Sequence, residues 1–349
     1  MQGVAFMGDR TLEFVTLDDP APAPGEVVLE IKASGLCGSD LKTYRAPKGG
    51  ALKGLGFKGS GEPVIAGHEP AGVVAAVGRN VDPRTCRVGD RVMVHHYHGC
   101  DVCPHCRTGW TQMCVEGPVV YGLTGHGSHA PYMKVPASTL VRLPDALSFS
   151  TGAAISCGTG TAYGALVRMN LSARDTIAIV GQGPVGLSAT QLAAAMGARV
   201  IAVDISAARA ARATEFGAAH TIDSSQVDPV EAIRELTGGL GVSRSLDTSG
   251  AAAGRSAAVR CAGAWGVVCF VGEGGQVTLE VSPEILRKQL TIVGSWTFST
   301  VGQADCARFV AERELPVDDL FTERWPLDQA AEAYRVFDRQ DTGKAVFLM

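Results

Sequence analysis

The stretch IAIVGQGPVG, residues 177–186, joins a short apolar run to a G-x-G-x-x-G motif, and it decides the fold class of the chain. The run is typical of a buried strand, and residues 185–196 carry an apolar stripe at helical spacing. In such a unit Gly181 permits the tight turn, Gly183 lets the backbone approach a pyrophosphate, and Gly186 lets the helix pack closely on the strand. The stretch therefore predicts a dinucleotide-binding turn; the alternative is a purely structural turn.

The residues around and after this turn indicate which dinucleotide it binds. Val185 begins the predicted helix directly after Pro184, and the helix N-terminus presents N–H groups and a positive dipole end to the phosphates. Asp204 ends the next apolar run, where a carboxylate accepts hydrogen bonds from the ribose hydroxyls and repels a 2′-phosphate. Arg209 lies one helical turn onward and either contacts the ribose or a phosphate or is a solvated helix charge. The pattern favours NAD over NADP.

Three regions follow one another along the chain. Residues 1 to about 150 carry short strand patterns separated by Gly and Pro, which indicates a β-rich domain. From about residue 155, apolar strands alternate with Ala-rich helices, as in βαβ units around a parallel sheet. After about residue 296 a final segment with its own helical stretches runs to Met349. The predicted strands are 27–31, 72–77, 91–94, 132–135, 177–180, 200–203, 246–247, 267–271 and 292–293, and the predicted helices include 185–196, 206–216 and 251–261.

Four cysteines at the spacing C-x2-C-x2-C-x7-C form the strongest single motif: Cys100, Cys103, Cys106 and Cys114. Closely spaced thiolates converge on a tetrahedral Zn²⁺ at Zn–S distances of about 2.3 Å, and four of them leave no position open for substrate. Two disulfides or four unrelated thiols are the alternative. The motif therefore predicts a structural zinc. Because it fills the coordination sphere, we expect the nearby His95, His96, His98 and His105 to be surface or hydrogen-bonding residues.

Composition excludes several classes of partner. A length of 349 residues suggests two domains. Charged residues make up 19% of the chain, its formal net charge is −4 and no run of like charges occurs, so neither nucleic acid nor an anionic membrane is indicated. No signal peptide and no stretch near the roughly twenty apolar residues of a membrane span is evident. We expect a cytoplasmic protein with reduced cysteines.

Three residues of metal-binding type stand in short Gly-containing segments: Cys37 in GLCGSD (35–40), His68 in GHEPAG (67–72) and Cys157 in SCGTG (156–160). Taken singly, a buried Cys or His is more often a packing residue than a ligand. Together with GDRV at 89–92, the four-cysteine segment and the glycine motif, they make the chain resemble the zinc-dependent alcohol dehydrogenases of the medium-chain dehydrogenase/reductase superfamily. The resemblance covers essentially the whole chain, with the segments in family order.

This resemblance implies both the zinc ligands and the domain organisation. Residues at the places of Cys37, His68 and Cys157 bind the catalytic zinc in that family, and the four-cysteine set binds a structural one. The implied fold class is α/β, with a GroES-like, zinc-binding catalytic domain over 1–155 and 296–349 and a doubly wound NAD-binding Rossmann domain over 156–295. Family members are dimers or tetramers, and the strand 292–294 resembles the segment that pairs across their interface. We therefore expect a homodimer or homotetramer.

The resemblance also suggests roles for four residues beside the ligands. Ser39 is placed to contact the substrate oxygen and start a proton relay, and a hydroxyl group can both donate and accept. Many relatives finish the relay with a His three residues later, but this chain has Lys42 there. Asp40 matches a carboxylate that bonds the zinc-bound imidazole and fixes its tautomer. Glu69 could approach the metal when water leaves; its alternative is a buried acid tied to a nearby arginine.

The implied ligand set predicts the chemistry. Two thiolates and a neutral imidazole bring Zn²⁺ near zero net charge and leave a fourth position for water or an alcohol oxygen. Such a zinc is a Lewis acid that favours an alkoxide over an alcohol, and the alkoxide passes hydride to C4 of the nicotinamide. We expect the oxidation of a primary or secondary alcohol, a small-molecule substrate, to an aldehyde or ketone with NAD.

Three other functions stay open. Residues 38–40 resemble the polyol branch of the superfamily while Cys157 resembles the alcohol dehydrogenase type, so a polyol or amino-alcohol dehydrogenase, sorbitol- or threonine-like, is the runner-up. The Gly/Lys-rich segment between Asp40 and Gly67, expected to form a loop beside the active-site cleft, matches neither branch. A non-catalytic, zinc-stabilised nucleotide-binding protein is the second alternative. The third is a zinc-ribbon module that reads nucleic acid, against which the near-neutral charge argues.

Overall fold

The computed structural model describes residues 1–48, 63–340 and 343–349 of the chain. The chain divides into two compact units, the first made of Met1–Cys157 and Ser299–Met349 and the second of Gly158–Phe298. Most of the Gly/Lys-rich segment predicted as a loop, residues 49–62, lies outside the described residues. Within the described ranges, no helix is both long enough and apolar enough to cross a membrane.

The first unit is built around one main sheet. Its described part has seven strands, six of them in the order β16-β17-β3-β4-β5-β9, and the seventh, β8, pairs with β3. Alternate residues of β3, namely Val27, Leu29 and Ile31, enter one apolar core with Val74 and Val92, because successive side chains of a strand point to opposite faces. The strand patterns predicted from the sequence at 27–31, 72–77, 91–94 and 132–135 all fall on strands of this sheet.

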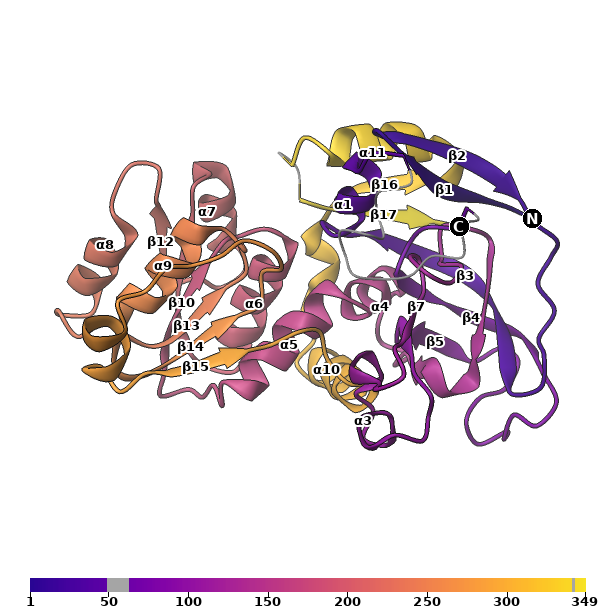
Figure 1. Ribbon diagram of the computed structural model, residues 1–349, viewed down its shortest axis with the longest axis horizontal. Coiled ribbons are helices and arrows are strands. Elements are labelled where there is room, and N and C mark those ends of the chain that lie inside the picture. The colour runs from indigo at the N-terminus through magenta and orange to yellow at the C-terminus, as the bar shows by residue number, and fades with distance from the viewer. Residues whose placement is uncertain (49–62, 341–342) are drawn as a thin grey trace. The chain divides into compact units, whose positions relative to one another are not determined.

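The elements of the first unit can be followed in Figure 1. Its strands are β1 (Gln2–Gly8), β2 (Thr11–Thr16), β3 (Glu26–Leu36), β4 (Glu69–Val77), β5 (Arg91–Val94), β6 (Tyr97–His98), β7 (Val119–Val120), β8 (Tyr132–Pro136), β9 (Leu140–Arg142), β16 (Phe321–Pro326) and β17 (Lys344–Leu348). Its α-helices are α1 (Asp40–Arg45), α3 (Pro104–Arg107), α4 (Phe149–Ile155), α10 (Thr300–Glu312) and α11 (Ala330–Phe337).

The C-terminal part of the chain completes this sheet. β17 is antiparallel to β3, with Ala345 opposite Leu36, and parallel to β16. Figure 1 shows β17 between β16 and β3. The sequence predicted only helical stretches after residue 296, and these are α10 and α11. The two strands were missed because β16 is rich in polar residues and β17 spans only five, so neither carries a strong local pattern.

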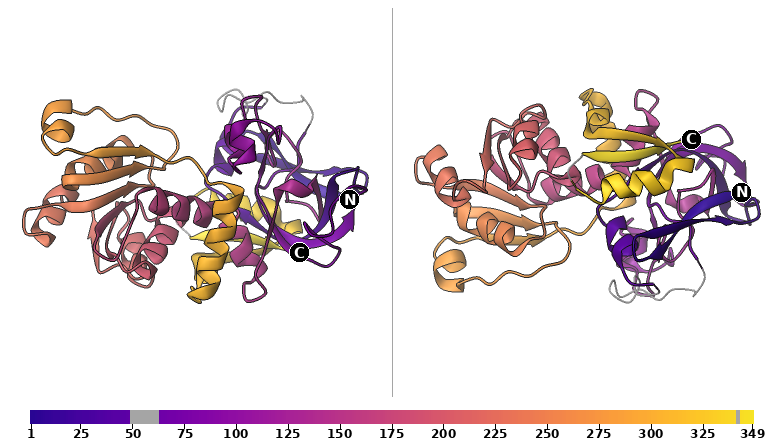
Figure 2. Two further views of the ribbon diagram at one scale, coloured as in Figure 1. Left: turned by 90° about the horizontal axis from the view of Figure 1, so that it is seen from below. Right: turned by 90° about the horizontal axis from the view of Figure 1, so that it is seen from above.

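The second unit contains a six-stranded sheet of entirely parallel strands, in the order β12-β11-β10-β13-β14-β15 within the described residues. Its strands are β10 (Thr176–Val180), β11 (Arg199–Asp204), β12 (His220–Asp223), β13 (Val242–Asp247), β14 (Ala262–Phe270) and β15 (Thr291–Gly294). Its helices are α5 (Gly158–Arg168), α6 (Pro184–Ala195), α7 (Ala207–Ala213), α8 (Pro229–Leu236) and α9 (Ala252–Cys261). Figure 2 gives two further views of both units. The predicted α/β class, with a doubly wound parallel sheet, is confirmed.

The glycine motif lies where the strand order of this sheet reverses. The chain runs from β10 outward to β11 and β12 and then returns to β13 on the other side of β10. In open α/β sheets, ligands bind at such a switch point, beyond the carboxyl ends of the strands. Gly181 directly follows β10 with φ of +94°, a conformation that glycine adopts readily, and Gly183 is the N-cap of α6. The predicted strand–turn–helix unit is therefore present.

Two local predictions in this unit were inaccurate. The strand β12 was missed, because its sequence His-Thr-Ile-Asp offers only one apolar residue, Ile222, which is buried. The helix predicted over 206–216 is shorter at both ends: Ser206 is the N-cap of α7 and accepts a hydrogen bond from the backbone N–H of Arg209, and the helix ends at Ala213, where a turn follows.

We predict that Gly186→Ala destabilises the second unit, whereas Gly183→Ala does not. A Cβ atom at Gly186 would collide with the carbonyl group of Gly181, while a Cβ atom at Gly183 would meet nothing within 4 Å. We expect the first substitution to cost about 1–3 kcal/mol, the usual cost of overpacking. Thermal unfolding of both variants measures this, and equal melting temperatures would contradict the account of the turn.

Candidate active site and metal-binding sites

The sheet of the first unit brings Cys37 and His68 together. Cys37 directly follows β3 and His68 directly precedes β4, and these antiparallel neighbours pair Gly35 with Glu69. Cys157 comes from a different part of the chain, two residues after α4 ends. The potential ligand atoms of Cys37, His68, Glu69 and Cys157 all lie within 4.8 Å of one another. Three segments far apart in sequence thus converge on one point.

The geometry of this cluster fits a zinc ion. Two thiolates bound tetrahedrally with Zn–S distances of about 2.3 Å stand about 3.8 Å apart. The Sγ atoms of Cys37 and Cys157 are 3.9 Å apart. The hydrogen bond from Cys157 holds the pKa of the Cys37 thiol well below its ordinary value, against the opposing effect of burial. The set therefore offers the sulfur and nitrogen donors that zinc prefers, at the spacing it requires.

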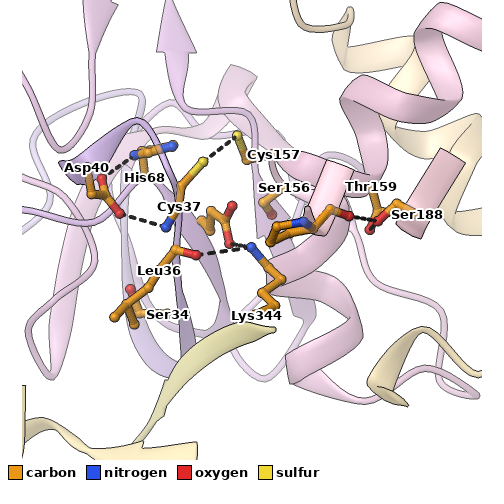
Figure 3. A network of polar contacts seen from close by, with 12 residues as sticks. Ser34, Leu36, Cys37, Asp40, His68, Ser156, Cys157, Thr159, Ser188 and Lys344 are labelled. Atoms are coloured by element: carbon orange, nitrogen blue, oxygen red, sulfur yellow. Dashed lines mark hydrogen bonds and ion pairs between the residues drawn. The ribbon is translucent and has the colours of Figure 1, made fainter. Parts of the chain in front are cut away.

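Asp40 and Ser39 flank the imidazole of His68. The Nδ1 atom of His68 lies 2.9 Å from Oδ1 of Asp40, which leaves Nε2 as the potential ligand atom (Figure 3). Asp40 Oδ2 accepts the backbone N–H of Cys37 at 2.9 Å, so one carboxylate holds two residues of the cluster. Ser39 Oγ lies 3.2 Å from Nε2 of His68, beside the ligand atom. Lys42, in contrast, is exposed on α1.

Glu69 is paired with a lysine and not with an arginine, the partner that its alternative interpretation had named. Its Oε2 atom forms an ion pair with Nζ of Lys344, the first residue of β17, and both side chains are buried. Nζ also donates to the carbonyl oxygen of Leu36 at 3.3 Å, as Figure 3 shows. Burial alone would lower the pKa of Lys344, but the Glu69 carboxylate raises it above its ordinary value. Burial raises the pKa of Glu69 to about 8, and the Lys344 ammonium group opposes this shift, so the pair is neutral overall only when Glu69 is ionised.

The four-cysteine motif forms a second cluster. The Sγ atoms of Cys100, Cys103, Cys106 and Cys114 lie within 4.8 Å of one another. Backbone N–H groups donate to three of them, from Cys103 to Cys100 at 3.4 Å, from Cys106 to Cys103 at 3.5 Å and from Cys100 to Cys114 at 3.3 Å. The N–H of Cys106 is the main reason that the pKa of Cys103 falls to about 6. Among the described residues, which include all ten cysteines, none forms a disulfide. Four converging thiols fit a closed zinc site.

The nucleotide turn of the second unit has one contact that the sequence did not predict. Asp204 ends β11 and is buried, and its two oxygens accept the backbone N–H groups of Gln182, at 2.6 Å, and Ser206, at 2.8 Å. The carboxylate therefore ties the glycine turn to the start of α7. Each oxygen keeps a second lone pair for a further donor. Arg209 is half-buried on α7.

The histidines near the cysteine motif were predicted to be surface or hydrogen-bonding residues, and for two of them the surface position is wrong. His95 and His96 are buried, and Nδ1 of His96 donates to the carbonyl oxygen of Ser156 at 3.0 Å. The ring of His96 lies 5.0 Å from that of His68, centroid to centroid. Its side chain therefore belongs to the surroundings of the Cys37 cluster. The apolar run Val92–Val94 just before these histidines was the one local sign of their burial.

Comparison with known proteins identifies the family. Residues 23–145 match the alcohol dehydrogenase GroES-like domain, and residues 184–313 match the zinc-binding dehydrogenase domain. The chain is 38% identical over 346 residues to the uncharacterized zinc-type alcohol dehydrogenase-like protein YphC of Escherichia coli (strain K12), covering 97% of this chain and 96% of that protein. It is 30% identical over 335 residues to a sorbitol dehydrogenase of Bacillus subtilis (strain 168), covering 95% and 92%.

A solved structure agrees with these matches in fold. The alcohol dehydrogenase TADH from Thermus sp. ATN1 has a TM-score of 0.90 and 28% sequence identity, covering 100% of this chain and 99% of that one. The family predicted from the motifs is thus confirmed along the whole chain. The chain belongs to the zinc-dependent alcohol dehydrogenases of the medium-chain dehydrogenase/reductase superfamily, and it is an oxidoreductase of a family that acts on small-molecule alcohols.

Proposed function

We propose that this protein is a zinc- and NAD-dependent alcohol dehydrogenase that oxidises a primary or secondary alcohol to an aldehyde or ketone. The observation that carries the proposal is the convergence of Cys37, His68 and Cys157, with the hydroxyl group of Ser39 beside the ligand atom of His68. A zinc ion held by these three residues supplies a Lewis acid with one position left for the substrate oxygen. The four-cysteine cluster holds a second, structural zinc.

The residues around the cluster prepare the alcohol for hydride loss. Ser39 would take the hydroxyl proton of the substrate while releasing its own proton to the next group of a relay, and a nicotinamide bound by the second unit would supply the hydride acceptor. Asp40 keeps the protonated nitrogen of His68 turned away from the ligand position. When both groups are ionised, the ion pair of Glu69 with Lys344 adds no net charge beside the cluster. Lys42 takes the place of the histidine that many relatives use to release the proton.

The glycine turn and Asp204 form the proposed NAD site in the second unit. Gly183 lets the pyrophosphate approach the start of α6, which begins with Pro184 and Val185, while Gly181 permits the turn and Gly186 the close packing of the helix. Asp204 accepts hydrogen bonds from the ribose hydroxyls through its remaining lone pairs while it also bonds the backbone of the glycine turn. Arg209 on α7 lies one turn onward and contacts the ribose or a phosphate. In this proposal the first unit is the catalytic domain and the second binds NAD.

A polyol or amino alcohol is the second candidate substrate. The similarity to a sorbitol dehydrogenase and the sequence Gly38-Ser39-Asp40 favour a polyol, while Cys157 as third ligand favours a simple alcohol. We also propose a homo-oligomer, dimeric or tetrameric, because β15 is the edge strand of its sheet and Ile292 on it is 40% exposed. A cytoplasmic location is proposed on composition.

The activity itself is tested by following NADH formation with primary alcohols, secondary alcohols, polyols and amino alcohols. We expect one class to react and a zinc chelator to abolish the reaction, because the substrate oxygen must be polarised by the metal. Turnover of polyols or amino alcohols alone would select the second candidate. No turnover of any class by protein that holds zinc and binds NAD would overturn the proposal and favour a non-catalytic nucleotide-binding protein.

Cys103→Ser is expected to affect stability and zinc content more than the chemical step. Loss of one thiolate opens the structural site, and such sites contribute directly to folding. The matched control is Cys86→Ser, which alters another buried thiol of the same unit that belongs to neither cluster. Zinc content and melting temperature should fall in Cys103→Ser only. A variant that kept both while losing turnover would refute the structural role.

Asp204→Ala is expected to relax the preference for NAD over NADP, because the carboxylate that repels a 2′-phosphate is removed. Asp223→Ala is the control, since Asp223 lies opposite Asp204 at the end of the neighbouring strand β12 and its carboxylate also accepts a backbone N–H, that of Ser225. The ratio of kcat/KM for the two cofactors measures the effect. An unchanged ratio in Asp204→Ala would contradict the ribose role.

A further inference from the structure

A continuous series of buried polar contacts runs outward from His68, and its links beyond Asp40 are hydrogen bonds. The six side chains are each at most 5% exposed. In order they are His68, Asp40, Tyr334, His129, Ser34 and Ser128. The links beyond Asp40 measure 3.2 Å from Tyr334 Oη to Asp40 Oδ2, 2.7 Å from His129 Nε2 to Tyr334 Oη, 2.7 Å from Ser34 Oγ to His129 Nδ1 and 2.6 Å between the serine hydroxyls.

The direction of every donor in this chain is fixed by its end at Asp40. A carboxylate only accepts, so Tyr334 gives its single hydroxyl proton to Asp40. Tyr334 must then accept from Nε2–H of His129, whose Nδ1 accepts from Ser34, and Ser34 accepts from Ser128. Burial lowers the pKa of His129 to about 4, which agrees with the neutral tautomer that this order requires. Each donor therefore has one acceptor, and the whole chain points toward Asp40.

A glycine in the backbone leaves space for this series of hydrogen-bonded side chains. Gly67, the residue before His68, has φ of +89°, and a Cβ atom there would collide with the imidazole of His129. Ser34 lies on β3, Tyr334 on α11 and His129 in the segment before β8. A strand, a helix and a connecting segment of the first unit thus meet next to His68, the proposed zinc ligand, and Gly67 provides the space.

The ring and the hydroxyl group of Tyr334 serve separable purposes. The ring packs in an aromatic cluster, 4.9 Å from Phe6 and 5.4 Å from Tyr44 between centroids, so a phenylalanine would preserve this contact. The hydroxyl group is one of two donors to Asp40 Oδ2, the other being the backbone N–H of Cys37. Removing it leaves the carboxylate one restraint fewer, and both residues that Asp40 holds, His68 and Cys37, are affected.

We propose that Tyr334 is a positioning residue of the catalytic zinc site: its hydroxyl group, oriented by His129, fixes the Asp40 carboxylate and thereby the direction of His68 and Cys37 toward the metal. The proposal rests on the proposed function, because it requires zinc at Cys37, His68 and Cys157. It extends the site to the C-terminal helix α11, whose residue acts through Asp40 and touches neither metal nor substrate.

The test is the rate at which a chelator removes zinc from Tyr334→Phe, with Tyr44→Phe as the matched control. Tyr44 is a buried tyrosine of the same aromatic cluster, and in the described part of the chain no hydrogen bond joins its hydroxyl group to Asp40. Zinc release is followed over time, and the kinetic phase that is present in the unaltered protein but missing in Cys157→Ser is assigned to the catalytic site. We expect that phase to be about 10–100-fold faster in Tyr334→Phe, the usual effect of losing a group that orients a metal ligand, and unchanged in Tyr44→Phe.

The outcomes separate this inference from the proposed function. Zinc release from Tyr334→Phe at the rate of Tyr44→Phe, in a protein whose catalytic zinc is verified, would overturn the positioning role alone. If Cys157→Ser held as much zinc as the unaltered protein, Cys157 would not be a zinc ligand, and the metal site on which the proposal rests would be refuted. If Tyr334→Phe does not fold, His129→Gln replaces it, and release as slow as in the control would again overturn the inference.

Discussion

The antiparallel pairing of β3 with β4 is the constraint on which the site depends. The register places Gly35 opposite Glu69, so Cys37 at the end of one strand and His68 at the start of the other become neighbours. A slip of one residue would turn every side chain of β4 to the opposite face of the sheet. Helix α4, which is followed two residues later by Cys157, packs against the same two strands. Strand β17, which begins with Lys344, pairs with β3. The proposed ligands and their charged neighbours are therefore positioned from one strand pair.

Charge balance explains why such polar residues tolerate burial at this place. A buried carboxylate or ammonium group is costly unless it is paired and hydrogen-bonded. Glu69 has Lys344, and Asp40 accepts the backbone N–H of Cys37 and the hydroxyl group of Tyr334 and lies 2.9 Å from Nδ1 of His68. The two thiols of the cluster are the donors that remain for a cation, and zinc bound to two thiolates would carry no net charge. The buried acids of the site are thus either paired with an opposite charge, as Glu69 is, or hydrogen-bonded, as Asp40 is.

Much of the fold could be predicted from the sequence because its signals are local, whereas the set of Cys37, His68 and Cys157 was proposed from the resemblance to a known family. The strand predicted at 91–94 is β5, and the turn after β10 needs only the glycines that stand there. The cysteine spacing likewise indicates its own cluster. Residues that act across the fold left no such signal: Lys344 reaches Glu69, and Tyr334 reaches Asp40, only because the C-terminal segment returns to β3. The second role of Asp204, holding the glycine turn, depends on the parallel packing of β10 and β11.

The central claim is that two distinct zinc ions lie in the first unit, one held by Cys37, His68 and Cys157 and one by the four-cysteine cluster. Anomalous diffraction from a crystal of the protein, recorded at the zinc absorption edge, tests it most directly. The account predicts two peaks in each chain, one among four Sγ atoms and one bounded by the Sγ atoms of Cys37 and Cys157 and by Nε2 of His68. A single peak at the four cysteines, or a second peak away from His68, would contradict it.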